Sequence, residues 1–260
     1  MDSIEEDNDD DNNHSLPSFS RLSALNIFDC PKLSSMPVFP CLERLGLVTS
    51  NLSPLEQIIS KGMIHMESQE NPTITVADST SSTSSTTSSF VPLSKLKSLT
   101  IGLKKGDRDR DRFLRSIAHL TAIEELEFRY SDEIDLFNNG NGMEWQGLKT
   151  LEISLCPNLT TIPEWICNFT SLQTLYIQHC PNLTSLPEGM PKSLSTLYIA
   201  CCPKLLERCK REKGEDWPKI AHIPNLELHL SEDDLSEDDS GIKSHYKEQN
   251  FFFHPLYFCS

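Results

Sequence analysis

A spaced pattern of apolar residues recurs along the chain and is the strongest signal in its sequence. The pattern is L-x-x-L-x-I-x-x-C, and its three clearest copies begin at Leu148, Leu172 and Leu194. The starting leucines lie 24 and 22 residues apart, and an upstream copy begins at Leu22. The second leucine and the isoleucine are two residues apart, so they share one face of an extended strand. Each copy therefore predicts one strand with an apolar inner face and a polar outer face.

Three further copies keep the apolar spacing without the cysteine, which brings the expected number of repeats to seven. They begin at Leu42, Leu96 and Ile123. Four repeats continue with C-P-x-L, and three close with an apolar residue before a proline. A period of about 20–29 residues is typical of leucine-rich repeats. Stacked repeats bury a continuous core beneath a parallel sheet, and their prolines favour irregular return segments.

The sequence therefore predicts an α/β fold, a leucine-rich-repeat solenoid. We expect a horseshoe with a parallel β-sheet on its concave face and mostly irregular or short helical segments on its convex face. An acidic, disordered N-terminus is expected over 1–15, and the repeat domain over 16–228. That domain contains a Ser/Thr-rich insertion at about 53–91 and a C-terminal cap at about 208–228. An acidic and aromatic disordered tail is expected over 229–260.

Cysteine recurs directly after the strand in four repeats. A small side chain there tolerates burial and donates weakly to neighbouring carbonyl groups, and leucine-rich repeats use Asn or Cys at this position. We predict reduced structural corner residues at Cys30, Cys156, Cys180 and Cys202. The alternative is a zinc site formed by Cys201, Cys202, Cys209 and His222, whose spacing matches no paired C-x-x-C arrangement.

Several segments depart from the repeat. Leu55, Ile58 and Ile59 indicate the start of a short helix, whereas residues 79–89 are serine and threonine only and indicate a surface insertion or a phosphorylated loop. Residues 104–117 combine alternating charge with apolar residues at helical spacing, which predicts an outer helix with a solvated face. The final F-F-F-H-P-L-Y-F-C-S is interpreted as a peptide added by splicing or read-through, or as a membrane-touching tail.

Charge and composition exclude several classes of protein. No apolar run of about 18 residues occurs, so we expect no membrane-spanning helix. The N-terminus lacks the positive charge and apolar stretch of a signal peptide. Most of the net charge of −15 comes from seven acidic residues within 1–13 and six within 231–240. The rest of the chain is nearly neutral and lacks the clustered Lys and Arg of a nucleic-acid-binding surface.

The sequence contains no motif that points to catalysis or to cofactor binding. It has no phosphate-binding G-x-x-x-x-G-K-[ST] loop, no H-E-x-x-H and no G-x-S-x-G. Its histidines are scattered, and the repeat already gives the apolar and cysteine positions a structural role. We therefore expect a protein that is not an enzyme and that uses no cofactor, no metal and no small-molecule substrate.

The outward side chains of the predicted strands form the candidate binding surface. Tyrosine and arginine recur among them, and these residue types anchor many protein interfaces. The predicted protein-binding concave face consists of Phe28, Asp29, Arg44, Glu127, Arg129, Tyr130, Glu152, Tyr176, Gln178, His179 and Tyr198. The alternative is that these residues are only the polar side of a solenoid.

The C-terminal half resembles a known family. The blocks L-E-I-S-L-C-P-N-L-T-T-I-P, L-Y-I-Q-H-C-P-N-L-T-S-L-P and L-Y-I-A-C-C-P-K-L precede R-C-K-R-E-K-G-E-D-W-P-K-I-A-H-I-P at 208–224. Together they are similar to the C-terminal leucine-rich repeats of plant disease-resistance proteins of the coiled-coil, nucleotide-binding class. The resemblance covers roughly residues 16–228. It implies that the last segment ends the array, with Trp217, Ile220 and Ile223 as a terminal cap.

The resemblance implies a cytoplasmic protein-recognition module of plant innate immunity that senses a pathogen effector or a guarded host protein. The sequence lacks the family's nucleotide-binding motifs, so we expect no nucleotide switching and interpret the chain as a fragment or truncated form. One alternative is a secreted or cell-surface ligand-binding protein, since N-x-[ST] sequons begin at Asn13, Asn51, Asn158, Asn168 and Asn182. Another is a stand-alone decoy or adaptor that binds the switch domain of a receptor.

Overall fold

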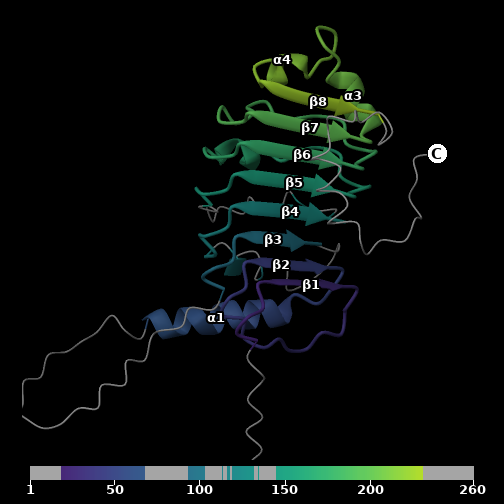
Figure 1. The fold of residues 1–260 in the computed structure, drawn as a ribbon. Coiled ribbons are helices and arrows are strands. Elements are labelled where there is room, and N and C mark those ends of the chain that lie inside the picture. The colour runs from purple at the N-terminus through teal and green to yellow at the C-terminus, as the bar shows by residue number, and fades with distance from the viewer. Residues whose placement is uncertain are drawn as a thin grey trace, which may run out of the picture.

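Eight short strands form a single open sheet in the computed structural model, which describes residues 19–67, 93–102, 113, 116–117, 119–131, 134 and 145–230. All neighbouring strands are parallel and follow one another in chain order (Figure 1). The strands are β1 (Ala24–Phe28), β2 (Arg44–Val48), β3 (Ser98–Ile101), β4 (Glu125–Arg129), β5 (Thr150–Ser154), β6 (Thr174–Gln178), β7 (Thr196–Ala200) and β8 (Asn225–His229). The chain is thus α/β and solenoid-like, with one strand for each turn of the chain.

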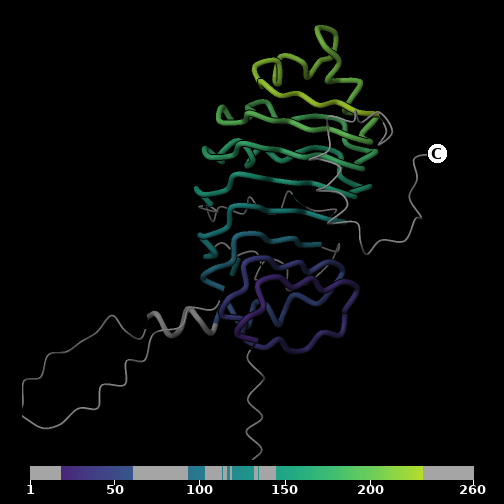
Figure 2. Tube along the Cα trace, in the orientation of Figure 1, coloured from purple at the N-terminus to yellow at the C-terminus, as the bar shows by residue number. Residues whose placement is uncertain are grey.

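Four helices are defined in the described parts of the segments between the strands. These are α1 (Ser53–Glu67), the 3-10 helix η2 (Glu164–Asn168), α3 (Pro203–Arg208) and α4 (Trp217–Ile220). Figure 2 shows how the fully described return segments, between β1 and β2 and from β5 to β8, lead back to the start of the next strand. Prolines stand at the helix starts: Pro163 precedes η2, and Pro203 begins α3. Proline fits these positions because the first turn of a helix does not use its backbone N–H groups internally.

The apolar rows predicted from the sequence lie in register beneath the sheet. Leu175 pairs with Leu151 on one side and with Leu197 on the other. The isoleucine two residues later in each of these strands forms a second row, and all six side chains are fully buried. Return segments complete the same core with Leu159, Ile162, Leu183 and Leu186. The main hydrophobic core of the described residues therefore runs from Met36 to Ile223.

The structure contains one more strand than the seven repeats predicted. In β8, Leu226 pairs with Leu197 and Leu228 pairs with Ile199, so the apolar rows continue for another turn. Ile220 and Ile223 are buried, and Trp217 packs against the core. These three residues, predicted to cover the last exposed core face, instead lie in the return segment between β7 and β8.

The insertion after β2 begins as a packed helix. Asn51 Oδ1 accepts a hydrogen bond from the Ser53 N–H at 3.1 Å at the start of α1. Leu55, Ile58 and Ile59 are buried against the core, as their helical spacing predicted. No helix in the part of the chain that the structure describes is long and apolar enough to cross a membrane.

Several predicted segments lie outside the described residues. These are the acidic N-terminus, the Ser/Thr-rich loop at 79–89 and residues 231–260 of the tail expected over 229–260. The first residue of that expected tail, His229, is instead the last residue of β8. Of the predicted outer helix at 104–117, only Phe113, Ser116 and Ile117 are described, and all three are buried.

Candidate protein-binding face

The side chains opposite the core form what we call the polar sheet face, made of positions one, three and five of each strand. Its central row carries five residue types over the eight strands, and neighbours in this row lie in register. The row reads Asn26, Gly46, Thr100, Glu127, Glu152, Tyr176, Tyr198 and Glu227. Parallel strands pack about 4.7–4.9 Å apart, which brings neighbouring side chains of the row into contact.

Eight of the eleven residues predicted for the binding face lie on the polar sheet face: Phe28, Arg44, Glu127, Arg129, Glu152, Tyr176, Gln178 and Tyr198. The other three, Asp29, Tyr130 and His179, follow their strands and have left-handed backbones with φ of 50°, 52° and 51°. A left-handed residue no longer obeys the alternation of a strand. These three therefore belong to the turn after the strand, and their prediction as outward strand residues is wrong.

The left-handed turn is a regular part of the repeat. The same position is occupied by Thr49, Leu155 and Cys201, with φ of 50°, 54° and 52°. Its N–H extends the sheet ladder by one bond: His179 donates to the Ala200 carbonyl at 3.1 Å and Leu155 to the Gln178 carbonyl at 3.0 Å. Glycine is the usual residue at a left-handed position, but none of these six turn residues is glycine. The turn therefore could not be predicted from residue type.

Much of the polar sheet face is buried, contrary to the expectation of exposed tyrosine and arginine side chains. Only 5% of Arg129 and none of Tyr198 is exposed. Arg129 packs beside Glu127, and its Nε and Nη2 atoms both lie 2.6 Å from Glu127 Oε1. Tyr198 stands between the rings of Tyr176 and His229, with ring centroids 5.8 and 5.4 Å away. Neighbours in register therefore cover side chains that a single strand leaves exposed.

Glu127 is an extensively bonded acid of the polar sheet face. Besides the pair with Arg129, its carboxylate accepts hydrogen bonds from Thr100 Oγ1 at 2.9 Å and from Ser154 Oγ at 2.9 Å. Three neighbouring strands are thereby joined on the polar side. A buried carboxylate needs such partners because removing its charge from water is costly.

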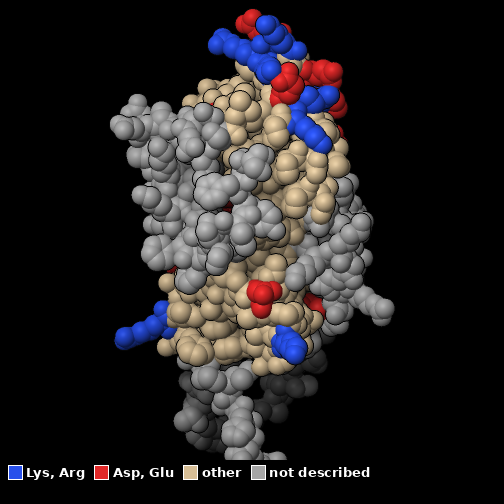
Figure 3. Space-filling view, turned by 90° about the vertical axis from the view of Figure 1, so that its right-hand side faces the viewer, with Lys and Arg blue, Asp and Glu red and all other residues tan. Residues whose placement is uncertain are grey.

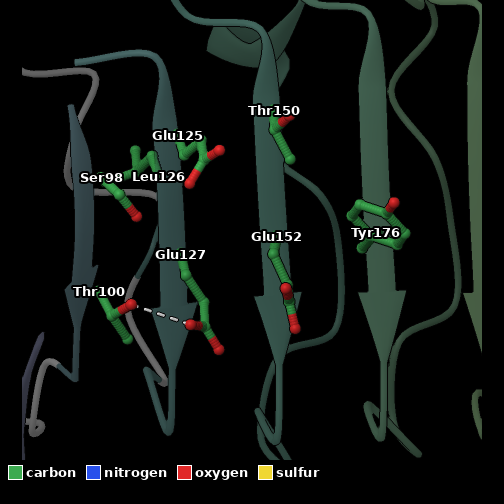
Figure 4. Close-up of a pocket in the computed structure, with 8 residues that line it drawn as sticks. All are labelled: Ser98, Thr100, Glu125, Leu126, Glu127, Thr150, Glu152 and Tyr176. Carbon is green, nitrogen blue, oxygen red and sulfur yellow. Dashed lines mark hydrogen bonds between the residues drawn. The ribbon is translucent and has the colours of Figure 1, made fainter. Parts of the chain in front are cut away.

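A hollow of about 240 Å³ opens on the polar sheet face above β3 to β6. It is lined by Ser98, Thr100, Glu125, Leu126, Glu127, Thr150, Glu152 and Tyr176 (Figure 4). Burial raises the pKa of the Tyr176 hydroxyl, and the charges of Glu152 and Glu227 raise that pKa further. The hollow is therefore an electronegative site with an aromatic ring at one side.

The corner cysteines make the same contact in each repeat. Cys156, Cys180 and Cys202 each place Sγ 3.2 Å from the carbonyl oxygen two residues earlier. Ser50 and Ser131 make the equivalent bond at 3.0 and 3.3 Å in repeats without cysteine. These three cysteines are fully buried and reduced, whereas Cys30, two residues after edge strand β1, is reduced and exposed. No group of three or more His, Cys, Asp or Glu side chains within the described ranges has the geometry of a metal site.

We expect Cys180→Ser to be tolerated and Cys180→Ala to destabilise the repeat. Serine can donate to the Gln178 carbonyl as Ser50 does in its own repeat, whereas alanine leaves buried carbonyl groups without this donor. The expected cost of Cys180→Ala in the free energy of unfolding is about 1–3 kcal/mol, measured by urea denaturation. A serine variant less stable than the alanine variant would contradict this role of the corner.

A second charged region lies at the C-terminal end of the solenoid. Figure 3 shows Lys, Arg, Asp and Glu side chains gathered over α3 and α4. Many of these charges are paired with one another: Arg208 with Glu215 and Asp216, Lys210 with Glu207, and Lys219 with Asp216 and Glu188. Because these charges pair with one another, they stabilise the C-terminal end of the array. The polar sheet face is therefore the stronger candidate for binding.

Comparison with known proteins gives one short match. A curated protein from Solanum bulbocastanum, "Putative disease resistance protein RGA4", is 70% identical to this chain over 23 residues. The matched segment is 9% of this chain and 2% of that protein, so the chain spans a small part of the length of its relative. No protein-family model matches the chain. The match supports a resistance-protein-like relation over this one segment.

Proposed function

We propose that this chain is a non-catalytic protein-recognition module of plant innate immunity. In this proposal the solenoid is a leucine-rich-repeat horseshoe, and the polar sheet face on its concave side binds a protein partner. The observation that carries it is the contrast between the rows of the sheet. The inner rows are almost uniformly leucine and isoleucine, while the central outer row changes from Thr100 through Glu127 and Glu152 to Tyr176. Since these outer side chains lie outside the main core, they can differ between repeats without disturbing it, and Tyr176 among them is only partly buried.

The immune setting rests on two sequence observations. One is the resemblance of the C-terminal repeats to plant disease-resistance proteins, and the other is the 23-residue match to a protein named for disease resistance. In that setting the partner is a pathogen effector, a guarded host protein or the switch domain of a receptor, and the encounter takes place in the cytoplasm.

The size of the hollow favours a protein partner over a small ligand. Pockets for drug-sized ligands and cofactors measure about 300–1,000 Å³, and the hollow of about 240 Å³ falls below that range. Its Tyr176 belongs to a residue type that anchors protein interfaces. A hollow of this size can take one side chain that a protein partner inserts as part of a broader interface.

The repeat also uses one of the sequon asparagines that the secreted alternative needs for a glycan. Asn182 Nδ2 donates to the Pro157 carbonyl at 2.9 Å, and Asn182 Oδ1 accepts from Lys204 Nζ at 2.7 Å. A glycan on Asn182 Nδ2 would crowd both contacts. The use of Asn182 in these two contacts favours the immune-receptor proposal over the secreted alternative.

Affinity capture from leaf tissue tests the proposal. Tagged wild-type chain, Tyr176→Ala on the polar sheet face and Thr170→Ala on an exposed return segment are expressed at equal level, with and without pathogen challenge. We expect a protein that wild type and Thr170→Ala retain and that Tyr176→Ala loses at least tenfold. Circular dichroism establishes that all three are folded. An identical set of captured proteins for all three chains would contradict recognition through this face.

A further inference from the structure

We infer that the two open edges of the sheet bind one another between copies of this chain, with β8 of one copy stacked against β1 of the next. The inference goes beyond the proposed function, because it concerns the ends of the array and leaves the polar sheet face open. Among the strands that the structure describes, β1 and β8 each have a neighbour on one side only. Such an edge presents a row of backbone groups that can pair with another chain.

The apolar rows are less deeply buried at these two edges than inside the array. Leu25 and Ile27 on β1 are half-buried, and so are Leu226 and Leu228 on β8. At the same positions of β2 to β7, every side chain is at most 2% exposed. Leu230, directly after β8, is 68% exposed. A further strand on either edge would remove apolar surface from water, which is the main favourable contribution to most protein association.

The backbone groups at the two edges are complementary. Successive residues of a parallel strand direct their N–H and C=O groups to opposite sides. The Ser23 carbonyl and the Asp29 N–H both bond to β2, at 3.0 Å each. The residues between them with the opposite direction, Ala24 and Asn26, therefore present their groups to the open edge of β1.

On β8 the other set of residues faces the open edge. The Asn225 N–H and the His229 carbonyl bond to the residues just before and just after β7, at 3.0 and 3.2 Å. Leu226 and Leu228 therefore present their backbone groups to the open edge of β8. One edge thus offers outer strand positions and the other offers inner positions.

This combination is the one by which the array joins its own strands. In all seven neighbouring pairs, the first residue of the later strand donates its N–H to the carbonyl of the residue just before the earlier strand, at 2.9–3.0 Å. In the proposed junction Ala24 is that first residue, and Pro224 of the other copy supplies the carbonyl. Stacking β8 on β1 therefore continues a contact that the molecule already makes, with both apolar rows in register.

Neither edge strand carries the residues that usually prevent such pairing. Natural edge strands are often protected by lysine, proline or inward-pointing charges. The β1 sequence ALNIF contains no proline and no charged residue, and the only acid of the β8 sequence NLELH is Glu227, on the polar sheet face. In the junction Glu227 lies beside the uncharged Asn26. No pair of like charges within the two strands therefore opposes the contact.

The acidic segments of the sequence set the conditions for association. Seven acids lie within residues 1–13, before β1, and six lie within residues 231–240, after β8. Like charges at both ends repel one another, and salt at about 1 M shortens the screening length to about 3 Å. We therefore expect copies to associate more strongly at high ionic strength than at low ionic strength.

Sedimentation equilibrium of the full chain at about 1 M sodium chloride tests the junction. Ile27→Lys blocks the β1 edge and Leu228→Lys blocks the β8 edge, because each places an inward-pointing charge on an edge strand. Thr170→Lys adds the same charge on an exposed return segment and is the control. We expect the average mass of wild type and Thr170→Lys to rise with concentration to at least twice the monomer mass. Each blocked chain alone should stay monomeric.

Mixing the two blocked chains is the decisive step. Ile27→Lys keeps an intact β8 edge, and Leu228→Lys keeps an intact β1 edge, so the mixture can form one junction. We expect a dimer of the two chains and nothing larger. Circular dichroism establishes that every chain is folded.

Proline variants replace the lysine variants if lysine unfolds the chain. Asn26→Pro and Leu230→Pro each remove an N–H that the strand alternation directs to an open edge. Neither substitution removes a hydrogen bond to the neighbouring strand of the array. The same result is expected: each proline chain alone is monomeric, and their mixture forms a dimer.

Four results would overturn the inference. A wild-type chain that stays monomeric at every concentration would show that the edges do not bind one another. Association that persists in both blocked chains would place the contact elsewhere. Association of Leu228→Lys alone would assign a two-fold contact to β1, and association of Ile27→Lys alone would assign one to β8.

Discussion

Replacing Leu175 with aspartate is expected to unfold the repeat array. Leu175 is fully buried on β6 and pairs with Leu151 and Leu197 in the inner row. Losing the side chain of a buried leucine costs about 2–5 kcal/mol, and burying an unpaired carboxylate adds several more. The sum approaches the whole stability of an ordinary domain, about 5–15 kcal/mol. We expect loss of the far-ultraviolet circular dichroism signal of the folded chain at neutral pH.

The adjacent positions provide matched controls for this variant. Thr174→Asp introduces the same charge one residue earlier, on the polar sheet face, and Tyr176→Ala removes an outer side chain one residue later. Both variants should keep the folded spectrum and a cooperative urea transition. A one-residue slip in register would move every side chain to the opposite face. Equal loss of structure in all three variants would therefore contradict the register described here.

Removing the buried carboxylate of Asp216 is expected to have the second largest effect. Asp216 is fully buried and accepts hydrogen bonds from the Leu186 N–H at 2.9 Å and from Arg208 Nη2 at 3.0 Å. Lys219 Nζ lies 3.2 Å from the same carboxylate and also donates to the Leu186 carbonyl at 2.9 Å. One side chain thus joins α3 and α4 to the return segment after β6.

We expect Asp216→Ala to lower the free energy of unfolding by about 3–5 kcal/mol, because it leaves its charged and backbone partners without their acceptor. The exposed neighbour Glu215 also pairs with Arg208, and Glu215→Ala is the control, with an expected cost of about 0–1 kcal/mol. Urea denaturation measures both variants. Equal costs for the two would contradict the central role of Asp216.

The same network predicts how stability responds to acid. Burial acts to raise the pKa of the Asp216 carboxyl, but the hydrogen bonds from Arg208, Leu186 and Lys219 outweigh burial and hold that pKa below its ordinary value. A carboxyl whose pKa is lower in the folded state stabilises the fold above its unfolded pKa, and this contribution is lost as pH falls through the folded pKa. Below about pH 4, wild type should therefore lose stability more steeply than Asp216→Asn. Parallel curves for both proteins would show that Asp216 is not the group responsible.

The sequence predicted buried positions well where apolar residues recur two residues apart within a strand. The pairs Leu151 with Ile153 and Leu175 with Ile177 are two residues apart, and this spacing alone placed them on the buried face of their strands. The pattern failed at β8, because a charged 24-residue segment precedes that strand and no corner cysteine follows Leu228. The signal present there is the pair Leu226 and Leu228, which lie two residues apart like the apolar pairs of the other strands.

Long-range contacts explain what the sequence alone did not predict about the candidate site. The burial of Tyr198 depends on Tyr176 and His229, which come from the two neighbouring strands. The Asp216 network joins positions 30 residues apart, at Leu186 and Asp216. By contrast, Glu127 and Arg129 are two residues apart on one strand. The strand pattern places both side chains on the same face, so their ion pair could be predicted from the sequence.

Site-specific cross-linking tests the central claim, recognition of a protein by the polar sheet face, most directly. A benzophenone amino acid is placed at position 174, on the polar sheet face beside Tyr176, or at position 170, on the exposed return segment, and both chains are irradiated in pathogen-challenged leaf tissue. The account predicts a discrete adduct with one protein from position 174, suppressed by excess unlabelled wild type, and none from position 170. The same adduct from both positions, or from position 170 alone, would contradict it.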